Sequence, residues 1–205
     1  MKILVLSDIH TDNLAAENAY RVERPDFVLD CGDHSEMRNI CEFTPHLYIH
    51  GNHEPSVITV NYDGLPLPFK IQSGVVVVLK KGDLEVRVAG IGGNYASPEK
   101  SNRVDEYNIE ALKSIQQGMV DIFLTHESPL LVPISSKNKV LAERVISEID
   151  RIKPKLVFSG HYGRFNPGIR TPGEVRNIIL DDMRKGYCIV DGKSLSVERK
   201  IARYK

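Results

Sequence analysis

Residues 46–54 read His-Leu-Tyr-Ile-His-Gly-Asn-His-Glu, a short apolar run that stops abruptly in polar side chains. The apolar part has the length of a buried β-strand. Glycine and asparagine after a strand often form only a turn. The group Gly51, Asn52, His53 and Glu54, however, also carries side chains that bind metals or move protons. One such strand tip is weak evidence, and its weight depends on how many others resemble it.

Four other apolar runs end in the same way. They are 3–7 before Asp8 and His10, 27–31 before Gly32 and Asp33, 122–125 before His126, and 156–159 before Gly160 and His161. In open α/β sheets ligands bind outside the carboxyl ends of the strands. We therefore expect the five tips to converge on one site.

Other segments show the patterns of helices and hairpins. Amphipathic helices are expected at 14–22, 104–117 and 140–152, with Asp12 or Asn13 capping the first. Two β-hairpins are expected, one joining 74–79 to 84–91 and one joining 186–190 to 194–201. Strand-helix repeats mixed with hairpins favour two β-sheets packed together, with helices on their outer faces.

Composition narrows the class of protein. The 205 residues suit one domain spanning 1–205. Lysine plus arginine number 27, as do aspartate plus glutamate, so the zero net charge disfavours nucleic-acid and anionic-membrane partners. No stretch approaches the roughly 18 apolar residues of a membrane span or resembles a signal peptide. We interpret Cys31, Cys41 and Cys188 as reduced core residues, and together these features predict a cytoplasmic protein.

The ordered blocks resemble the motifs of calcineurin-like metallophosphoesterases. These blocks are Asp8-Ile9-His10, Gly32-Asp33, Gly51-Asn52-His53-Glu54, His126 and Gly160-His161, and they span about three-quarters of the chain. The resemblance implies an α/β (α+β) fold, a four-layer αββα sandwich of two mixed β-sheets flanked by helices, with metals at the strand ends. Carried over by position, Asp8 and His10 bind the first metal, Asp33 bridges both metals, and Asn52, His126 and His161 bind the second.

These residue types suit the implied chemistry. Carboxylate, imidazole and amide-oxygen ligands favour two divalent ions, Mn²⁺ first with Fe, Zn²⁺ or Ni²⁺ as alternatives, over Ca²⁺ or a thiolate-bound zinc. Only a carboxylate such as Asp33 can serve both ions with its two oxygens. Two ions about 3.5–4 Å apart lower the pKa of a bridging water and hold a phosphate for in-line attack by hydroxide. The expected activity is hydrolysis of a phosphate mono- or diester.

Four further residues are candidates for acid catalysis or for binding the substrate phosphate. His53 is expected to protonate the leaving-group oxygen as a general acid. Glu36 stands where many members carry an aspartate that pairs with this histidine, and it would raise the pKa of His53, unless it is a solvated residue at a helix start. Arg164 and Tyr162 are candidates for binding a substrate phosphate, with a surface role for Arg164 as the alternative.

One position departs from the Gly-His-x-His pattern of much of the superfamily. Gly163 replaces the second histidine, which leaves Asp8, His10 and Asp33 for the first metal. The phosphoprotein phosphatase branch works with this reduced set, but the loss also allows a singly loaded or weakly active protein. The alternative function is thus an inactive scaffold or binding protein, and six retained polar ligands favour the enzyme because such groups are costly to bury.

The sequence leaves the substrate open between small-molecule and protein phosphate esters. Loops expected at 55–68 and 127–138 would lie at the rim of the site and select it. Oligomeric state is also open, because the pair of strands at 186–201 is either a capped edge or a dimer edge.

Overall fold

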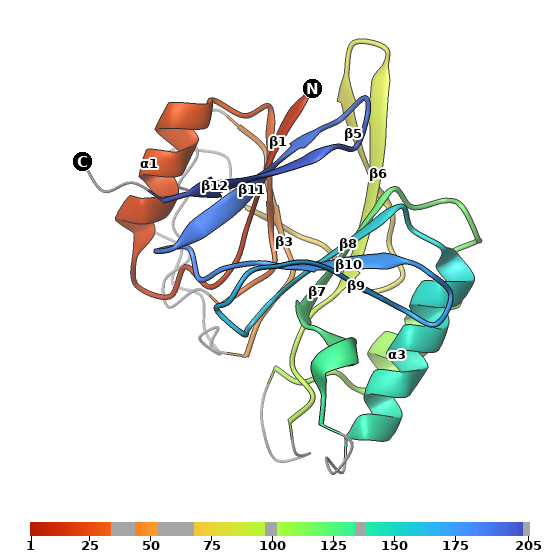
Figure 1. The fold of residues 1–205 in the computed structure, drawn as a ribbon. Coiled ribbons are helices and arrows are strands. Elements are labelled where there is room, and N and C mark those ends of the chain that lie inside the picture. Colours follow the sequence, from red (N-terminus) through yellow and green to blue (C-terminus); the bar gives the residue numbers. More distant parts are fainter. Residues whose placement is uncertain (34–43, 53–67, 97–101, 134–137, 203–205) are drawn as a thin grey trace.

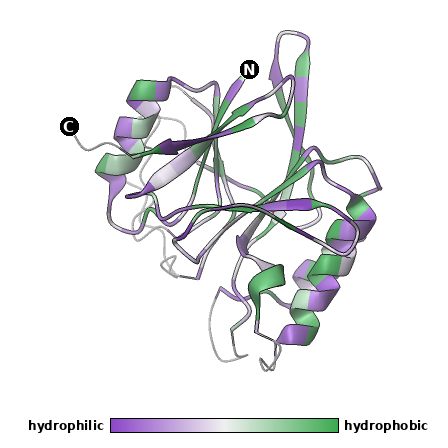
Figure 2. Cartoon of the chain, viewed as in Figure 1, coloured by the Kyte–Doolittle hydropathy of each residue, from purple (hydrophilic) through white to green (hydrophobic). Residues whose placement is uncertain are grey.

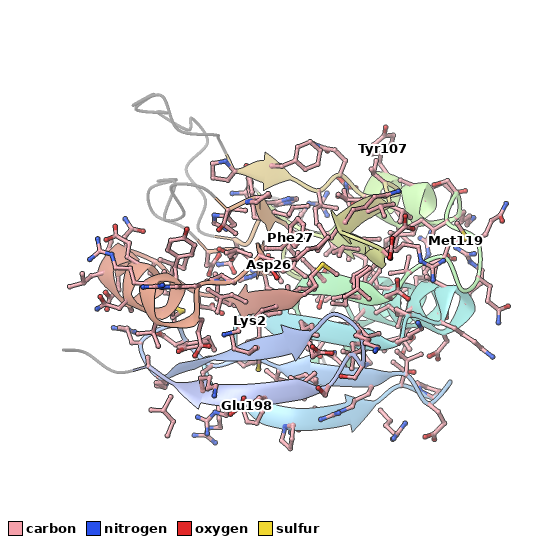
Figure 3. All side chains as sticks on the ribbon, turned by 90° about the horizontal axis from the view of Figure 1, so that it is seen from above. Lys2, Asp26, Phe27, Tyr107, Met119 and Glu198 are labelled. Atoms are coloured by element: carbon pink, nitrogen blue, oxygen red, sulfur yellow. The ribbon has the colours of Figure 1, made fainter. Side chains whose placement is uncertain are left out.

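The computed structural model describes residues 1–33, 44–52, 68–96, 102–133 and 138–202. These ranges form two six-stranded β-sheets with helices against their outer faces (Figure 1). Side chains fill the space between the layers, as the view from above shows (Figure 3). The order helix, sheet, sheet, helix confirms the predicted four-layer αββα sandwich.

The first sheet has the strand order β12-β11-β1-β2-β3-β4. Its strands are β1 (Lys2–Leu6), β2 (Phe27–Asp30), β3 (His46–Tyr48), β4 (Phe69–Lys70), β11 (Gly186–Asp191) and β12 (Val197–Ile201). Strands β1, β2, β3 and β4 run parallel to one another, whereas β11 is antiparallel to both of its neighbours, β1 and β12. The predicted hairpin at 186–201 is therefore confirmed, and it extends the sheet beside β1.

The second sheet has the order β5-β6-β7-β8-β10-β9. Its strands are β5 (Val77–Lys81), β6 (Leu84–Ile91), β7 (Ile122–Glu127), β8 (Leu156–Gly160), β9 (Asn166–Arg170) and β10 (Arg176–Ile179). The central four run parallel, and β5 and β9 are antiparallel edge strands. The hairpin β5–β6 was predicted, whereas β9 and β10 were not. The sequence did not predict β9 because Pro167 and Gly168 are unfavourable in most strands. Proline is tolerated here because β9 lies at the edge of the sheet.

Burial on both faces explains why the strand sequences are apolar without alternation. In β1, Ile3 and Val5 pack into the core between the sheets. Leu4 and Leu6 pack on the other side, in the cluster that includes the alanines of α1 (Asn13–Glu23). The second sheet repeats this arrangement, with its outer face packed against α2 (Glu106–Leu112) and α3 (Lys139–Ile152).

The helices agree with the sequence in position but not always in length. Asp12 caps α1 by accepting a hydrogen bond from the Ala15 N–H at 3.2 Å, as predicted. The helix α3 (Lys139–Ile152) also matches, and its apolar residues alternate with polar ones so that one stripe faces the sheet (Figure 2). The helix α2 (Glu106–Leu112) is shorter than the predicted 104–117. After Leu112 the backbone bonds span three residues, as from Ile115 N–H to Leu112 O at 3.0 Å, which ends the α-helix.

Three smaller predictions concern cysteines, loops and membrane spans. Cys31 and Cys188 are buried free thiols, as predicted, and Cys41 lies outside the described residues. The predicted loop 127–138 contains the end of β7 and a short 3-10 helix, η1 (Pro129–Leu131), before residues that the structure does not describe. In the described ranges, no helix has the length and apolar character needed to cross a bilayer.

Ion pairs of the buried Asp121 carboxylate with Arg87 and Lys155 join β6 to the residues that precede β7 and β8 in the second sheet. The Asp121 carboxylate accepts hydrogen bonds from Arg87 N–H at 2.8 Å and Arg87 Nε at 3.1 Å, and lies 2.9 Å from Lys155 Nζ. Burial acts to raise its pKa, but Arg87 and Lys155 outweigh burial and hold the pKa at about 2. Because this is below the unfolded value of about 3.9, the stabilisation is present above pH 4 and is lost as the pH falls toward 2.

Asp121→Asn is therefore expected to lower the free energy of unfolding by about 1–2 kcal/mol at pH 7, allowing for salt screening of the two cations. Urea denaturation across pH 7 to 2.5 measures it, and the gap between variant and wild type should narrow as the pH falls. Asp83→Asn makes the same charge change at an exposed turn and should stay within about 0.5 kcal/mol of wild type. A gap that does not depend on pH would contradict the electrostatic account.

Candidate metal centre

The carboxyl ends of β1, β2, β3, β7 and β8 bring the predicted ligands together. Two groups form there, and in each group the ligand atoms lie within 4.8 Å of one another. One group contains Asp8, His10 and Asp33, and the other contains Asp33, His126 and His161. Asp33 belongs to both groups. Its carboxylate therefore lies where two cations could share it.

The Asp33 carboxylate is buried and is fixed by the chain after β3. The Asn52 N–H donates to Oδ1 at 2.7 Å, and Nε2 of His126 lies 3.4 Å from the same oxygen. This close approach needs glycine at position 51, because a Cβ there would stand 2.1 Å from Asp33 Oδ1. The Gly51-Asn52 pair thus shapes the site as well as carrying the predicted ligand Asn52.

His126 links the two sheets across the site. It is fully buried, and its Nδ1 donates to the Cys31 carbonyl oxygen at 2.8 Å. Its Nε2 therefore faces the site, 2.9 Å from Asn52 Oδ1. Burial acts to lower the pKa of His126, but the carboxylates of Asp33 and Asp8 outweigh burial and raise this pKa to about 9. A cation binding here would displace the proton on Nε2, so metal binding and protonation compete.

Asp8 makes the second link between the sheets. Its Oδ2 accepts hydrogen bonds from the Ser7 hydroxyl at 2.6 Å and from the His161 N–H at 2.8 Å. Nδ1 of His161 lies 3.3 Å from Nε2 of His126, and burial together with the charge on His126 lowers the pKa of His161. His10 is partly exposed, with Nε2 4.0 Å from Asp8 Oδ1. Carboxylate and imidazole donors thus face one small volume from both sheets.

Four of the nine described non-glycine residues with a positive φ angle lie at this site. Asp8, His10, Asp33 and His161 have φ angles of 55°, 51°, 71° and 72°, in the left-handed region. Each such residue costs about 1–2 kcal/mol when it is not glycine. Strain of this kind is maintained mainly where a functional geometry needs it. The strained turns support a functional role for this edge.

The family of the chain follows from a family model. The model for the calcineurin-like phosphoesterase superfamily domain matches residues 1–176. The chain belongs to this superfamily. All of the candidate ligands lie within the matched residues. No curated protein matches the chain.

Solved structures share the calcineurin-like fold at low identity. The protein TT1561 of Thermus thermophilus is 17% identical, with a TM-score of 0.64 over 98% of this chain and 99% of that one. A novel phosphatase from Mycoplasma pneumoniae is 11% identical, with a TM-score of 0.51 over 98% and 93%. GAP50, the anchor in the inner membrane complex of Plasmodium, is 11% identical, with a TM-score of 0.56 over 100% and 90%. At these identities the likeness shows the fold alone.

The two predicted phosphate-binding residues of this calcineurin-like chain differ in their surroundings. Arg164 is exposed. The Tyr162 hydroxyl instead donates to Glu127 Oε1 at 3.0 Å, and burial together with Glu127 raises the pKa of Tyr162 well above its usual value. Sequence reasoning missed Glu127 and Ser7. The one available signal was their place in the chain, since each directly adjoins a predicted ligand.

Two predicted catalytic residues, His53 and Glu36, lie outside the described residues. The neighbouring His46 is described, and its Nε2 pairs with the buried Asp30 carboxylate at 3.2 Å. Asp30 in turn accepts a hydrogen bond from the Gly32 N–H at 2.8 Å. This pair supports the turn that carries Asp33.

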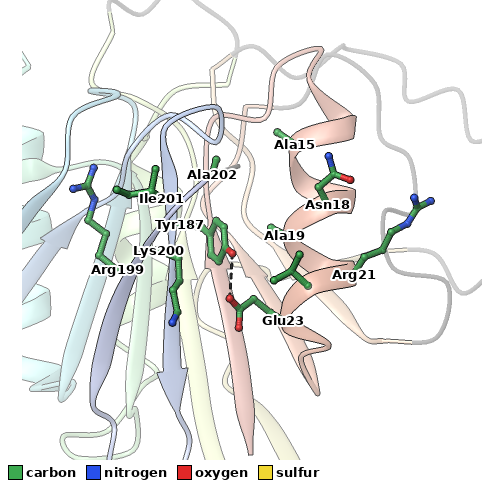
Figure 4. Close-up of a pocket in the computed structure, with 11 residues that line it drawn as sticks. Ala15, Asn18, Ala19, Arg21, Glu23, Tyr187, Arg199, Lys200, Ile201 and Ala202 are labelled. Carbon is green, nitrogen blue, oxygen red and sulfur yellow. Dashed lines mark hydrogen bonds between the residues drawn. The ribbon is translucent and has the colours of Figure 1, made fainter. Parts of the chain in front are cut away.

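A pocket of about 590 Å³ lies elsewhere, between α1 and β12 (Figure 4). Ala15, Ala19 and Ile201 give it an apolar lining. The Tyr187 hydroxyl donates to Glu23 Oε1 at 3.1 Å within it. None of its lining residues is a candidate ligand. The pocket is therefore separate from the candidate metal centre.

Proposed function

We propose that this chain is a binuclear metallophosphoesterase that hydrolyses a phosphate mono- or diester. The observation that carries the proposal is the membership of Asp33 in two ligand groups at the edge where the sheets meet. Membership of the calcineurin-like phosphoesterase superfamily supports phosphate-ester hydrolysis as the class of reaction.

The donor set suits two divalent cations. Asp8, His10 and Asp33 would hold the first, and Asp33, Asn52, His126 and His161 would hold the second. Asp8 and Asp33 are buried carboxylates that face imidazole nitrogens, and buried carboxylates are stable when they are paired or bind metal. Mixed oxygen and imidazole donors fit Mn²⁺ best, with Fe, Zn²⁺ or Ni²⁺ as alternatives.

The chain supplies a rigid setting for the reaction. Two bound cations would stabilise negative charge on the phosphate as Lewis acids and would acidify water toward neutral pH. The Cys31 carbonyl fixes the tautomer of His126, so that Nε2 faces the site. The Ser7 hydroxyl and the His161 N–H hold one oxygen of Asp8, and the Asn52 N–H holds one of Asp33. This support sets the ligand directions before any cation binds, and no protein nucleophile is required.

The first metal would rest on a smaller ligand set. A Cβ at Gly163 would meet only Asp182 Cβ at 3.6 Å and Lys185 Nζ at 3.8 Å, among atoms within 4 Å. Lys185 Nζ also donates to the Gly163 carbonyl oxygen at 2.8 Å. A cationic side chain therefore lies beside the position where the Gly-His-x-His pattern of much of the superfamily has its second histidine. We accordingly propose that the first metal binds more weakly than the second.

His53 is proposed as the general acid, with Glu36 as its orienting partner. His53→Ala is expected to lower turnover of an alkyl phosphate about 10²–10⁴-fold, because its poor leaving group needs a proton. An activated aryl phosphate should lose far less. Parallel kinetics on both substrates, with bound metal counted in each protein, measure this difference. Equal losses on the two substrates would argue against a general acid.

A scaffold is the second candidate function. GAP50 has this fold and is described as the anchor in the inner membrane complex of Plasmodium, so a role in assembly is the alternative to be tested for this chain. The buried ligands favour the enzyme, because a scaffold would gain nothing from burying Asp8, Asp33 and His126 together.

Hydrolysis assays on metal-stripped protein test the proposal. An activated aryl phosphomonoester and the matching diester are assayed while Mn²⁺ is added. Turnover that rises with bound Mn²⁺ supports the enzyme, and the ratio of the two rates gives the substrate class. Metal binding without turnover of either ester would favour the scaffold. The single domain over 1–205, the cytoplasmic location and the choice between small-molecule and protein substrates stay predictions.

A further inference from the structure

Glu127 lies between two tyrosines beside the candidate metal centre. It directly follows His126 at the end of β7. Its Oε1 accepts the hydroxyl of Tyr162 at 3.0 Å, and its Oε2 accepts the N–H of Tyr95 at 2.6 Å. Both carboxylate oxygens therefore accept a hydrogen bond, each from a different tyrosine. Glu127 belongs to neither ligand group found among the described residues.

Tyr162, which is held by its hydrogen bond to Glu127, in turn contacts the ring of His161. The two rings meet edge to face, with centroids 5.3 Å apart and planes at 81°. On its other side the His161 ring meets His126 at 5.1 Å and 74°. The backbone of His161 is held by Asp8, but its ring direction depends on these two neighbours. A shift of the Tyr162 ring is therefore expected to change the direction of the His161 ring, of which one nitrogen lies within 4.8 Å of an Asp33 carboxylate oxygen.

The second carboxylate oxygen of Glu127, Oε2, is held by Tyr95, which lies 32 residues earlier in the chain. Tyr95 follows β6, and its carbonyl oxygen accepts a hydrogen bond from Asn138 Nδ2 at 2.8 Å. Asn138 directly precedes α3. Glu127 thus joins the end of β6, the start of α3 and the turn after β8. An acceptor held from several elements is suited to fixing a neighbouring side chain.

We propose that Glu127 and Tyr162 are positioning residues that orient His161 and so set the affinity of the second metal. The inference rests on the proposed function. It gives Tyr162 a different role from the phosphate contact expected from the sequence, because the hydroxyl is already committed to Glu127. Partners that orient metal ligands typically change metal affinity about 10–100-fold when they are removed.

Calorimetric titration of metal-stripped protein with Mn²⁺ tests this inference. Tyr162→Phe keeps the ring and removes only the hydroxyl, and Glu127→Gln keeps the shape but loses one acceptor. Each is expected to weaken the tighter binding step about 10-fold or more and to leave the weaker step unchanged. The double variant should bind Mn²⁺ at the tighter step no more weakly than the single variant with the lower affinity, since both substitutions remove the same Glu127–Tyr162 hydrogen bond. The thermal midpoint of each metal-free variant should stay close to wild type, which excludes general destabilisation.

Tyr107→Phe is the matched control, because Tyr107 is 80% exposed on α2 and should leave both steps unchanged. The inference is overturned if Tyr162→Phe and Glu127→Gln bind both ions as wild type does. It is also overturned if Tyr162→Phe raises KM for an aryl phosphate with metal affinity unchanged, since Tyr162 would then contact substrate. Wild-type protein that binds fewer than two ions would instead reject the proposed binuclear function, so the two failures are distinguishable.

Discussion

Replacing Asp33 with asparagine is expected to abolish phosphoesterase activity and to remove at least one metal ion. Asparagine keeps one oxygen for the Asn52 N–H, so the local backbone bond survives. It cannot offer two carboxylate oxygens to two cations. Loss of one Lewis acid is worth several kcal/mol, so kcat/KM should fall by at least about 10³-fold. Kinetics and metal analysis of the same preparation measure both effects.

Asp105→Asn provides the control for this charge change. Asp105 caps α2 by accepting a hydrogen bond from the Asn108 N–H at 2.8 Å, and asparagine caps helices equally well. This variant should keep wild-type turnover and metal content. Asp33→Asn protein that retains turnover with a full metal complement would reject the bridging role.

Gly51→Ala is expected to have the second largest effect. The added Cβ would stand 2.1 Å from Asp33 Oδ1 and 2.5 Å from Asp33 N, so the turn that carries Asp33 must move. A displacement of about 1 Å at a catalytic group can cost roughly 10²-fold in rate. Overpacking should also lower the free energy of unfolding by about 1–3 kcal/mol. Turnover, Mn²⁺ affinity and urea denaturation together measure these changes.

Gly118→Ala separates the steric effect from the ordinary cost of losing a glycine. A Cβ at Gly118 meets nothing within 4 Å, although its φ of 75° disfavours alanine. It should lower stability by about 1–2 kcal/mol and leave metal affinity and turnover unchanged. If Gly51→Ala behaved like this control, the close approach of residue 51 to Asp33 would not be needed for the site.

Much of the fold could be predicted because the signals are local. Continuous apolar runs such as 3–7 and 122–125 indicate strands buried on both faces, and the structure buries Ile3 and Leu4 on opposite sides of β1. The order of the polar tips predicted the grouping of Asp8, Asp33 and His126, because the carboxyl ends of parallel strands meet at one edge.

Other features depend on contacts that no local pattern encodes. The edge strand β9 contains proline and glycine, and the end of α2 is set by turns after Leu112. The Glu127–Tyr162 hydrogen bond joins residues that are 35 positions apart. The sequence around each residue contains no pattern that indicates this contact. Such support for a site becomes visible only when the strands are placed side by side.

Anomalous diffraction from crystals grown with Mn²⁺ tests the bridging of two cations by Asp33 most directly. We expect two peaks about 3.5–4 Å apart, one beside Asp8 and His10 and one beside Asn52, His126 and His161, with the Asp33 carboxylate contacting both. A single peak, or two peaks of which only one contacts Asp33, would contradict the binuclear centre.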